Sequence, residues 1–204
     1  MAAAALWLLA SYFLGAVPTS YLVSRIFAKI DLRQHGSGNL GATNLYRVLG
    51  WKYAVPVALF DISKGAIPVL VFAPQGSDSE LFALACGIAA ILGHVFSVFV
   101  SFKGGKGVAT AAGVMLALTP LALAVAATAW ALVVMLTGYV SLGSIGAALV
   151  LPPAVFFLES PSAELLWFDT LVAAGVIILH RRNIQRLLKG TENRFGRRAA
   201  TTRS

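Results

Sequence analysis

VATAAGVMLALTPLALAVAATAWALVVMLT, residues 108–137, is an uninterrupted apolar run without a charged residue. A helix needs about 20 residues to cross the hydrocarbon of a membrane, so the run is longer than one ordinary span. Thr119-Pro120 is the natural place for a break, because proline lacks a backbone donor and disfavours helical geometry in the residue before it. Whether the run forms one helix or two decides on which side of a membrane the rest of the chain lies.

The composition indicates a membrane protein. Apolar residues make up 58% of the 204 residues and charged residues 12%, against roughly 45–50% and about 25% in soluble domains. The other apolar segments lack the ten-residue alternation of a membrane barrel, so we predict an all-α integral membrane protein. No Ser- or Gly-rich linker marks a boundary, which predicts a single domain over residues 1–204. These other apolar segments cover residues 3–27, 51–73, 80–101, 142–158 and 164–180.

Basic residues gather on alternate connections between the apolar segments. Five of the sixteen lie at 25–52, two at 103–106, and eight from residue 181 onward. Short basic loops stay on the cytoplasmic side of a membrane. The connections around 78–80 and 159–164 carry acids and no bases, so we expect them outside.

This alternation requires a break within the run at 108–137. A single helix there would place the acidic connection at 159–164 inside, whereas two segments, 108–118 and 120–137, restore the pattern. The first segment is short, about 16 Å at 1.5 Å per residue. We therefore predict seven spans, with the N-terminus outside, a short fourth helix, and a basic cytoplasmic tail at 181–204.

HGSGNLGATNLYR, residues 35–47, is the first polar cluster on the predicted cytoplasmic side. Its glycines permit close backbone approach, and Arg47 supplies a planar cationic fork that suits an anion. A solvated loop that caps the following helix is the alternative, although such a loop does not need this density of glycine, hydroxyl and amide groups. The short polar side chains of the cluster are Ser37, Asn39, Thr43 and Asn44.

SFKGGKGVAT, residues 101–110, is the second cluster. We expect its glycines to leave backbone N–H groups free beside the N-terminus of a helix that begins near Val108, where the dipole favours an anion. The segment is not a Walker loop, because Gly107 stands where that motif has a hydroxyl residue. A glycine turn with cytoplasmic lysines is the alternative to a phosphate site. The candidate phosphate ligands are Lys103, Gly104, Gly105, Lys106 and Gly107.

The last two clusters also lie on the predicted cytoplasmic side. GYVSLGS, residues 138–144, is a glycine turn with a hydroxyl at Ser141, and alone it reads as a plain connector. In HRRNIQRLLKGTENRFG, residues 180–196, His180 and Asn183 are three apart and so share one face of a helix. The arginines of this cluster suit anionic lipid headgroups better than substrate; they are Arg181, Arg182 and Arg186.

Polar residues also occur inside the apolar segments. Asp61 and Lys64 are three apart and can pair, and a charge at this depth usually faces a bundle interior or a cavity. Structural pairing and the lining of a polar site are both open for them. His94 has no charged neighbour in sequence, so we assign it to packing or a helix hydrogen bond. Cys86 is the only cysteine and fits a buried apolar position, which excludes an intrachain disulfide.

Four of these motifs, SGNLGATN, FKGGKGVAT, GYVSLGS and HRRNIQRLLKGTENRFG, carry a resemblance over nearly the whole chain. In order and spacing they resemble the bacterial acyl-phosphate:glycerol-3-phosphate acyltransferases, the PlsY family. The resemblance implies transfer of a fatty acyl group from acyl phosphate to the 1-hydroxyl of sn-glycerol 3-phosphate. It also implies a bacterial inner membrane location with the active site facing the cytoplasm.

The resemblance also implies roles for particular residues. Ser37 and Arg47 are expected in catalysis, together with His180 and Asn183. The glycine loop with Lys103 and Lys106 is expected to bind glycerol 3-phosphate, and Glu192 mainly to hold structure. We add Thr43, Asn44 and Ser141 as phosphate contacts, and Asn39, Asp61 and Lys64 as supporting residues.

A carrier or channel for a phosphorylated solute is the main alternative from another class of protein. Glycine-interrupted short helices and the Asp61/Lys64 pair favour it. Against it, the polar clusters crowd at one membrane face, and acidic loops on the other would repel a phosphate. The three histidines are widely spaced and lack a carboxylate cluster, so we expect neither a metal nor another cofactor. We expect the chain to function as a monomer.

Overall fold

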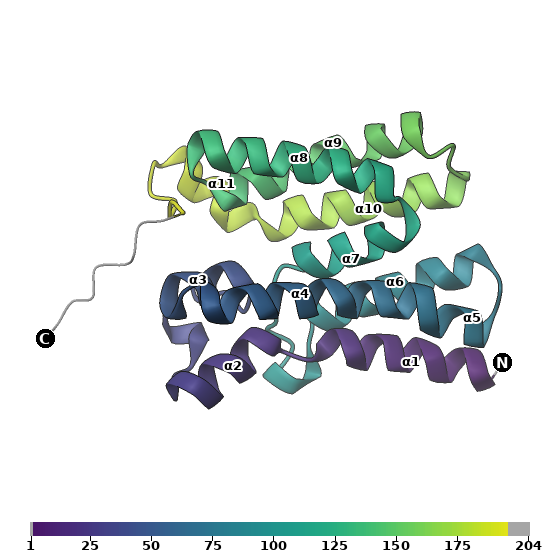
Figure 1. The fold of residues 1–204 in the computed structure, drawn as a ribbon, viewed down its shortest axis with the longest axis horizontal. Coiled ribbons are helices and arrows are strands. Elements are labelled where there is room, and N and C mark those ends of the chain that lie inside the picture. Colours follow the sequence, from purple (N-terminus) through teal and green to yellow (C-terminus); the bar gives the residue numbers. More distant parts are fainter. Residues whose placement is uncertain (1, 196–204) are drawn as a thin grey trace, which may run out of the picture.

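The computed structural model describes residues 2–195, and within them every regular element is helical, which confirms the all-α prediction (Figure 1). The part of the predicted tail at 196–204 lies outside the described residues. The elements are α1 (Ala2–Ala16), α2 (Thr19–Ala28), η1 (Leu32–Gln34), α3 (Ala42–Leu49), α4 (Trp51–Ile67), η2 (Pro68–Phe72), α5 (Ala73–Gly76), α6 (Glu80–Val95), η3 (Val98–Val100), α7 (Val108–Leu118), α8 (Pro120–Thr137), α9 (Val140–Leu158), α10 (Ala163–Leu179) and α11 (Arg181–Leu188).

Four helices within these residues are long and apolar enough to cross a membrane. Two bent pairs, α1 with α2 and α10 with α11, raise the number to six if each pair is counted as one span. The short apolar helix α7 has 11 residues, fewer than the length that crosses the hydrocarbon. By length and composition the described chain therefore has four to six candidate spans, and the predicted short fourth segment is α7. The four long helices are Trp51–Gly76, Glu80–Val100, Pro120–Thr137 and Val140–Leu158.

Proline sets where several of these helices change course. α7 and α8 meet at Thr119, where the sequence predicted the break. The segment 3–27, predicted as one helix, is instead divided at Pro18 into α1 and α2, which are bent by 42°. Pro68 begins a short π-helical turn that carries the second span on to Gly76, three residues beyond its predicted end. The all-helical plan was therefore predictable, but the position of the first bend was not.

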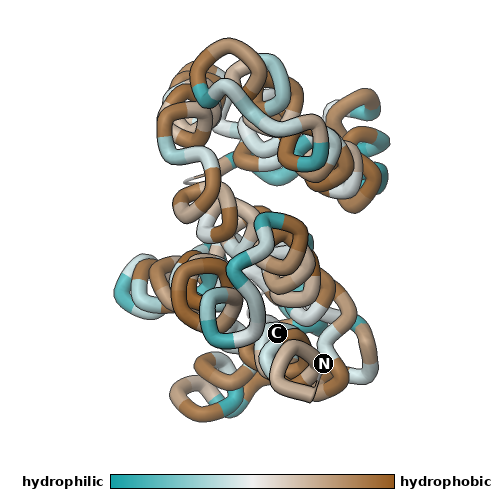
Figure 2. Tube along the Cα trace, turned by 90° about the vertical axis from the view of Figure 1, so that its right-hand side faces the viewer, coloured by the Kyte–Doolittle hydropathy of each residue, from teal (hydrophilic) through white to brown (hydrophobic). Residues whose placement is uncertain are grey.

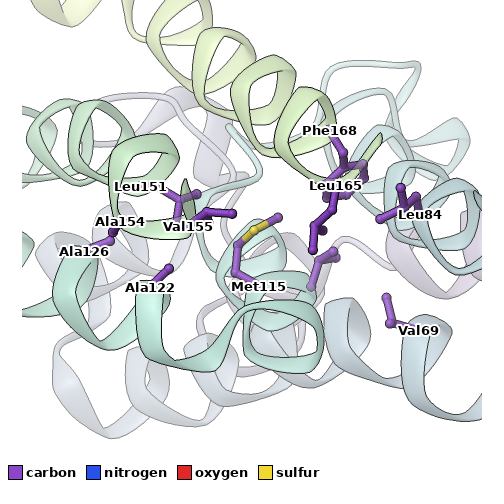
Figure 3. Packing of buried hydrophobic residues seen from close by; sticks show 11 residues of the cluster. Val69, Leu84, Met115, Ala122, Ala126, Leu151, Ala154, Val155, Leu165 and Phe168 are labelled. Atoms are coloured by element: carbon purple, nitrogen blue, oxygen red, sulfur yellow. The ribbon is translucent and has the colours of Figure 1, made fainter. Parts of the chain in front are cut away.

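The helices form two groups with α7 between them (Figures 1 and 2). One group is built on α1 against α6 and on α4, and the other on α8, α9 and α10. α7 packs against α4 on one side and α8 on the other. A buried apolar cluster around Met115 of α7 includes residues of both groups, among them Val69, Leu84, Leu151 and Phe168 (Figure 3). α7 is thus the core element that joins the two groups.

α4 and α7 approach each other closely because both present glycine at the contact. A Cβ at Gly65 would overlap the carbonyl oxygen of Thr110, and one at Gly113 would overlap that of Ile62. Small residues at such crossings let two backbones come together, which is how helices in membranes gain packing energy. This contact fixes the height of α7 against α4, and therefore the place of the loop that precedes α7.

The polar motifs gather at one end of the molecule. α2, α3 and α11 lie at the end opposite the N-terminus (Figure 1). The loop before α7 and the turn between α8 and α9 open toward the same end. Residues separated by almost 150 positions in the chain therefore meet there, as the contact of Arg47 with Asn193 illustrates.

Candidate active site

A cavity of about 460 Å³ lies where α3, α7 and α9 meet the start of α11. Its inner wall is apolar and comes from α7, α8, α9 and α10, with Met115, Leu123 and Leu151 among its residues. Its other end is polar and brings together members of all four sequence clusters. The polar lining residues are Ser37, Asn39, Thr43, Asn44, Arg47, Asp61, His94, Lys106, Ser141, Ser144, His180, Asn183 and Glu192.

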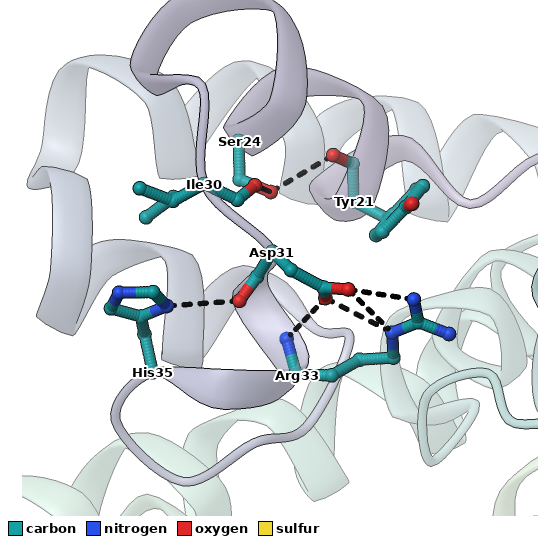
Figure 4. Close-up of polar contacts among 6 residues, drawn as sticks. All are labelled: Tyr21, Ser24, Ile30, Asp31, Arg33 and His35. Carbon is teal, nitrogen blue, oxygen red and sulfur yellow. Dashed lines mark hydrogen bonds and ion pairs between the residues drawn. The ribbon is translucent and has the colours of Figure 1, made fainter.

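The chain enters the first cluster through a turn fixed by Asp31 (Figure 4). The Asp31 carboxylate accepts hydrogen bonds from the backbone N–H of Arg33 at 3.0 Å and from the Arg33 guanidinium at 2.6–3.2 Å. These bonds from Arg33 lower the pKa of Asp31 to about 2. The Nδ1 atom of His35 lies 2.9 Å from the carbonyl oxygen of Asp31. Asp31 therefore anchors the turn that leads to Ser37.

Asn44 shapes the loop that carries Ser37. Its buried side-chain oxygen accepts the backbone N–H of Ser37 at 2.8 Å, and its amide donates to the carbonyls of His35 at 3.0 Å and Leu32 at 3.4 Å. These bonds satisfy both ends of the amide. Asn44 is thus bonded within the loop, although it also lines the cavity, and the phosphate contact that we expected for it stays a prediction.

Arg47 lies on α3 beside the C-terminal segment. Its Nη2 donates to the carbonyl of Asn193 at 3.5 Å, while its buried Nε has no hydrogen-bond partner within residues 2–195. Burial lowers the pKa of Arg47, although the nearby Glu192 acts in the opposite direction. A buried guanidinium donor that faces a cavity is suited to an anionic ligand.

The glycine loop is folded back onto the end of α6. The N–H of Gly104 donates to the carbonyl of Val95 at 3.0 Å, and that of Gly105 to the carbonyl of His94 at 3.1 Å. These two N–H groups are therefore used within the protein, contrary to our expectation that they are free. The N–H groups of the first turn of α7 have no partner within the helix, and Val108 and Ala109 of this turn line the cavity. Gly107, with φ +75°, caps that helix.

The two lysines of this loop differ in position. Lys106 lines the cavity, and its Nζ is hydrogen-bonded to the side-chain oxygen of Asn183. Burial lowers the pKa of Lys106 to about 8. Lys103 is exposed and does not line the cavity, so the structure does not support the phosphate contact that we expected for it.

Glu192 joins the last two clusters. Its Oε1 accepts from Ser141 at 2.8 Å and from Asn183 at 2.7 Å, and its Oε2 accepts from Arg186 at 2.6 Å. Burial alone would raise the pKa of Glu192, but the bonds from Asn183, Arg186 and Ser141 outweigh it and lower the pKa. Ser141, which we expected to bind phosphate, therefore donates to Glu192, and the structural role that we expected for Glu192 stays a prediction.

His180 stands at the bend between α10 and α11. Its Nδ1 lies 2.8 Å from the carbonyl oxygen of Val176, and a carbonyl can only accept. Nδ1 therefore carries the proton, which leaves Nε2 of the neutral ring as an acceptor. His180 and Asn183, which we predicted to share one helix face, both line the cavity.

Asp61 and Lys64 form the predicted pair at 2.8 Å, with both side chains almost wholly buried. Asp61 both pairs with Lys64 and lines the cavity, whereas Lys64 is not among the residues that line it. His94 lines the cavity as well, although its sequence context indicated only packing. Nothing near His94 in sequence could reveal this, because its polar neighbour Asp61 belongs to another helix.

The arrangement joins an anion site to an apolar chamber. Arg47 and Lys106 provide positive charge at the polar end, and the apolar walls of α7 to α10 can surround a hydrocarbon chain. Within residues 2–195 no three residues among His, Cys, Asp and Glu lie together as a metal site would require. Such a cavity suits a ligand that carries both a phosphate and an acyl chain.

The fold and this site define the class as an integral membrane enzyme with a cationic pocket beside lipid. Residues 5–190 match the family model described as glycerol-3-phosphate acyltransferase. The chain is 48% identical over 195 residues to the glycerol-3-phosphate acyltransferase of Trichlorobacter lovleyi, covering 96% of this chain and 99% of that protein. It is 46% identical to glycerol-3-phosphate acyltransferase 2 of Bacillus anthracis, covering 93% and 98%.

Solved structures agree with these relatives. The crystal structure of PlsY (YgiH), an integral membrane glycerol 3-phosphate acyltransferase in its glycerol 3-phosphate form, superposes with a TM-score of 0.88 at 40% identity, covering 95% of this chain and 96% of that one. The lysophosphatidic acid form of PlsY gives a TM-score of 0.84 at 39% identity, covering 95% of each chain. This chain belongs to the glycerol-3-phosphate acyltransferase family, as its motifs indicated.

Proposed function

We propose that this protein transfers a fatty acyl group from acyl phosphate to the 1-hydroxyl of sn-glycerol 3-phosphate, giving lysophosphatidic acid and inorganic phosphate. One observation carries the proposal: a single cavity joins Arg47 and Lys106 at its polar end to an apolar chamber between α7 and α10. Both substrates carry phosphate, and one also carries an acyl chain. The names and structures of the relatives support glycerol 3-phosphate as the acceptor.

The reaction needs positioning more than covalent help from the protein. Acyl phosphate is a mixed anhydride, so the acceptor hydroxyl oxygen attacks its carbonyl carbon and the bond to the phosphate oxygen breaks. Lys106 and Arg47 hold the negatively charged groups, and they stabilise the charge that develops on the carbonyl and leaving oxygens. No acyl-enzyme is required, so Ser37 acts as a hydrogen-bond donor that orients a substrate.

The acceptor hydroxyl must lose a proton as it attacks. Nε2 of His180 is free to accept it, because Nδ1 is held by Val176. The leaving phosphate is the second group that can take the proton. The chain lacks the H-x-x-x-x-D pattern of acyl-CoA enzymes, because Phe99 and Gln185 stand where the aspartate would follow His94 and His180. This absence favours acyl phosphate over acyl-CoA as the donor.

We also propose in which membrane the protein lies and how it is oriented there. The charge pattern supports seven spans, counting the bent pairs and the short α7, with the N-terminus outside and the site facing the cytoplasm of a bacterial inner membrane. We further propose that the chain forms a single domain and functions as a monomer. A carrier is disfavoured, because Met115 and Leu151 at the inner wall of the cavity belong to the buried apolar cluster.

Purified protein in detergent, given palmitoyl phosphate and glycerol 3-phosphate, should release phosphate and form a matching amount of lysophosphatidic acid. Palmitoyl-CoA in place of palmitoyl phosphate should give no product. Product from the CoA ester alone would reassign the donor. A folded protein that is inactive with both donors would count against the enzyme and call for a glycerol 3-phosphate uptake assay in liposomes.

A further inference from the structure

Four polar side chains from three helices form a buried group beside the glycine loop; we name Thr19, Asp61, Lys64 and His94 the Asp61 group. Oδ1 of Asp61 lies 2.8 Å from Nζ of Lys64, accepts the Thr19 hydroxyl at 3.1 Å, and lies 4.0 Å from Nδ1 of His94. All but Thr19 are more than nine-tenths buried. The group therefore couples α2, α4 and α6 at one carboxylate oxygen.

Lys64 is itself tied to the bend in the first helix. Its Nζ donates to the carbonyl of Val17 at 2.8 Å, at the bend between α1 and α2. The Val17 carbonyl and the Asp61 carboxylate are therefore the two partners of the Lys64 ammonium. A charge buried in a membrane needs such partners. Lys64 thus balances the charge of Asp61 from the side away from the cavity.

His94 contacts the glycine loop through both its backbone and its ring. Its carbonyl accepts the N–H of Gly105 at 3.1 Å, and the next carbonyl, that of Val95, accepts the N–H of Gly104. A Cβ at Gly105 would overlap Nε2 of the His94 ring, so the ring lies directly against the loop. The residue that follows Gly105 is Lys106, whose ammonium lies in the cavity.

The position of the ring depends on the Asp61 group. Within residues 2–195, Nδ1 of His94 is buried without a hydrogen-bond partner, and the carboxylate of Asp61 is the charged oxygen that faces it. The ring lies between that carboxylate on one side and Gly105 on the other. A shift of the ring would therefore move the loop and, with it, the ammonium of Lys106.

We propose that Asp61, Lys64 and His94 are positioning residues that hold the glycine loop against α6, and so set the affinity for the phosphate of glycerol 3-phosphate. The inference rests on the proposed function and on the expectation from the motifs that the glycine loop with Lys106 binds that phosphate. Acyl phosphate is held in addition by its hydrocarbon chain in the apolar chamber, so its binding depends less on the loop. The group acts through the loop and takes no part in bond making.

The first test is His94→Leu, which removes the ring nitrogens and leaves no unpaired charge. The expected result is a rise in KM for glycerol 3-phosphate on the order of tenfold, with the KM for acyl phosphate within about twofold of wild type. Asp61→Asn alone would leave Lys64 buried without its partner. The double variant Asp61→Asn/Lys64→Met removes both charges together, so it should retain folding and show the same selective rise.

Asp169 supplies the matched control. Its carboxyl group is also fully buried in a membrane helix, α10, but it neither lines the cavity nor contacts the loop. Asp169→Asn should leave both KM values at the wild-type level. Thermal unfolding in detergent, measured for every variant, identifies any that fail to fold.

A rescue experiment tests the ring contact itself. Gly105→Ala places a methyl group against the His94 ring and should raise the KM for glycerol 3-phosphate. Combined with His94→Ala, the added effect of Gly105→Ala should become smaller than in the wild-type background, because the clash with the ring is gone and only the carbonyl oxygen of Leu40, 2.9 Å from the new Cβ, remains. Independent contributions would instead make the two effects multiply.

Two results would overturn the positioning role. One is a folded His94→Leu protein with wild-type KM for glycerol 3-phosphate; the other is an equal rise in KM for both substrates, which marks a general structural role. These outcomes are distinct from a failure of the proposed function. Wild-type protein without turnover that depends on glycerol 3-phosphate would overturn both proposals, whereas normal wild-type turnover with unaffected variants would overturn only this one.

Discussion

At the scale of single residues, two kinds of side chain lie at the polar end of the cavity. Some hydrogen-bond to other protein groups and shape the site, and others can bind a ligand. Asn44 and Glu192 are both buried there, yet their hydrogen bonds go to protein groups. Arg47 and Lys106 retain donor capacity on the cavity side. Mutations at the two kinds of residue should therefore differ, because the first kind disturbs the shape of the site and the second its charge.

The pKa of Lys106 predicts an alkaline limit to substrate use. Burial lowers this pKa to about 8, so the ammonium is present below that pH and is lost as the pH rises through it. The second pKa of a phosphate monoester is about 6, so a dianion and an ammonium coexist between these values. The kcat/KM for glycerol 3-phosphate should be highest there and fall as the pH rises through about 8.

The check is a pH profile of kcat/KM from 6 to 10 for wild type and for Lys106→Arg. Arginine stays charged throughout this range, so the variant should lose the alkaline fall even if its overall rate is lower. A variant that keeps the same fall would assign the titration to another group.

The sequence predicted which residues gather at the site better than it predicted what each one binds. Ser37, His180 and Asn183 all line the cavity, because glycine-rich polar clusters on one membrane face must meet there. Asn44 and Ser141 have hydroxyl or amide groups that suit a phosphate equally well, but buried protein partners occupy them. The partners of Asn44 lie in the neighbouring loop but are set by how that loop folds, and the partner of Ser141 is Glu192, which is distant in the chain.

At the scale of the helices, proline marks two breaks, although Pro56 and Pro152 lie inside helices that continue through them. Thr119-Pro120 separates α7 from α8 as predicted. Pro18 bends the first helix, which the apolar run alone did not reveal. A backbone carbonyl released by such a bend needs a donor, and Lys64 from α4 donates to Val17. The bend thus depends on a tertiary contact that no reading of the first segment alone could supply.

The close contact of α4 with α7 predicts a strong effect of one methyl group. Gly113→Ala should destabilise the protein by about 1–3 kcal/mol, because its Cβ meets the backbone of Ile62. It should also lower activity, since α7 carries the loop with Lys106. A Cβ added at Gly175 in α10 would meet no atom within 4 Å. Gly175→Ala should therefore be neutral or stabilise the protein by roughly 0.5–1 kcal/mol.

Thermal unfolding in detergent, together with turnover at a temperature where both variants are folded, tests this pair. Equal melting temperatures for the two alanine variants would mean that the crossing of α4 and α7 can relax without cost. In that case the position of α7 would have to be fixed by its contacts with α8 and with the apolar core.

At the scale of the whole molecule, the C-terminal segment joins the two groups of helices at the site. Phe195 stacks on Tyr46 of α3 with ring centroids 4.6 Å apart, and its N–H donates to the carbonyl of Gly138 at 2.6 Å. Arg194 donates to the hydroxyl of Tyr139 at 3.1 Å. α7 joins the groups in the core, and this segment joins them at the polar end.

The proposed orientation predicts opposite labelling of two loops. Cys86 is the only cysteine and is buried, so Cys86→Ala gives a background without thiols. On that background Asp78→Cys should react with a membrane-impermeant maleimide in intact cells. Lys189→Cys should react only after the inner membrane is opened. Labelling of both sites, or of Lys189→Cys alone, in intact cells would reverse or refute the topology.

The place of Glu192 and Phe195 in the chain has a consequence for biosynthesis. The ribosome adds them after α1 to α11, so a chain synthesised only as far as α11 lacks the Glu192 carboxylate that joins Ser141 to Asn183. A chain that ends just after α11 would still have its membrane helices but would lack Glu192 at the site. Premature termination at this point should therefore yield an inactive membrane protein.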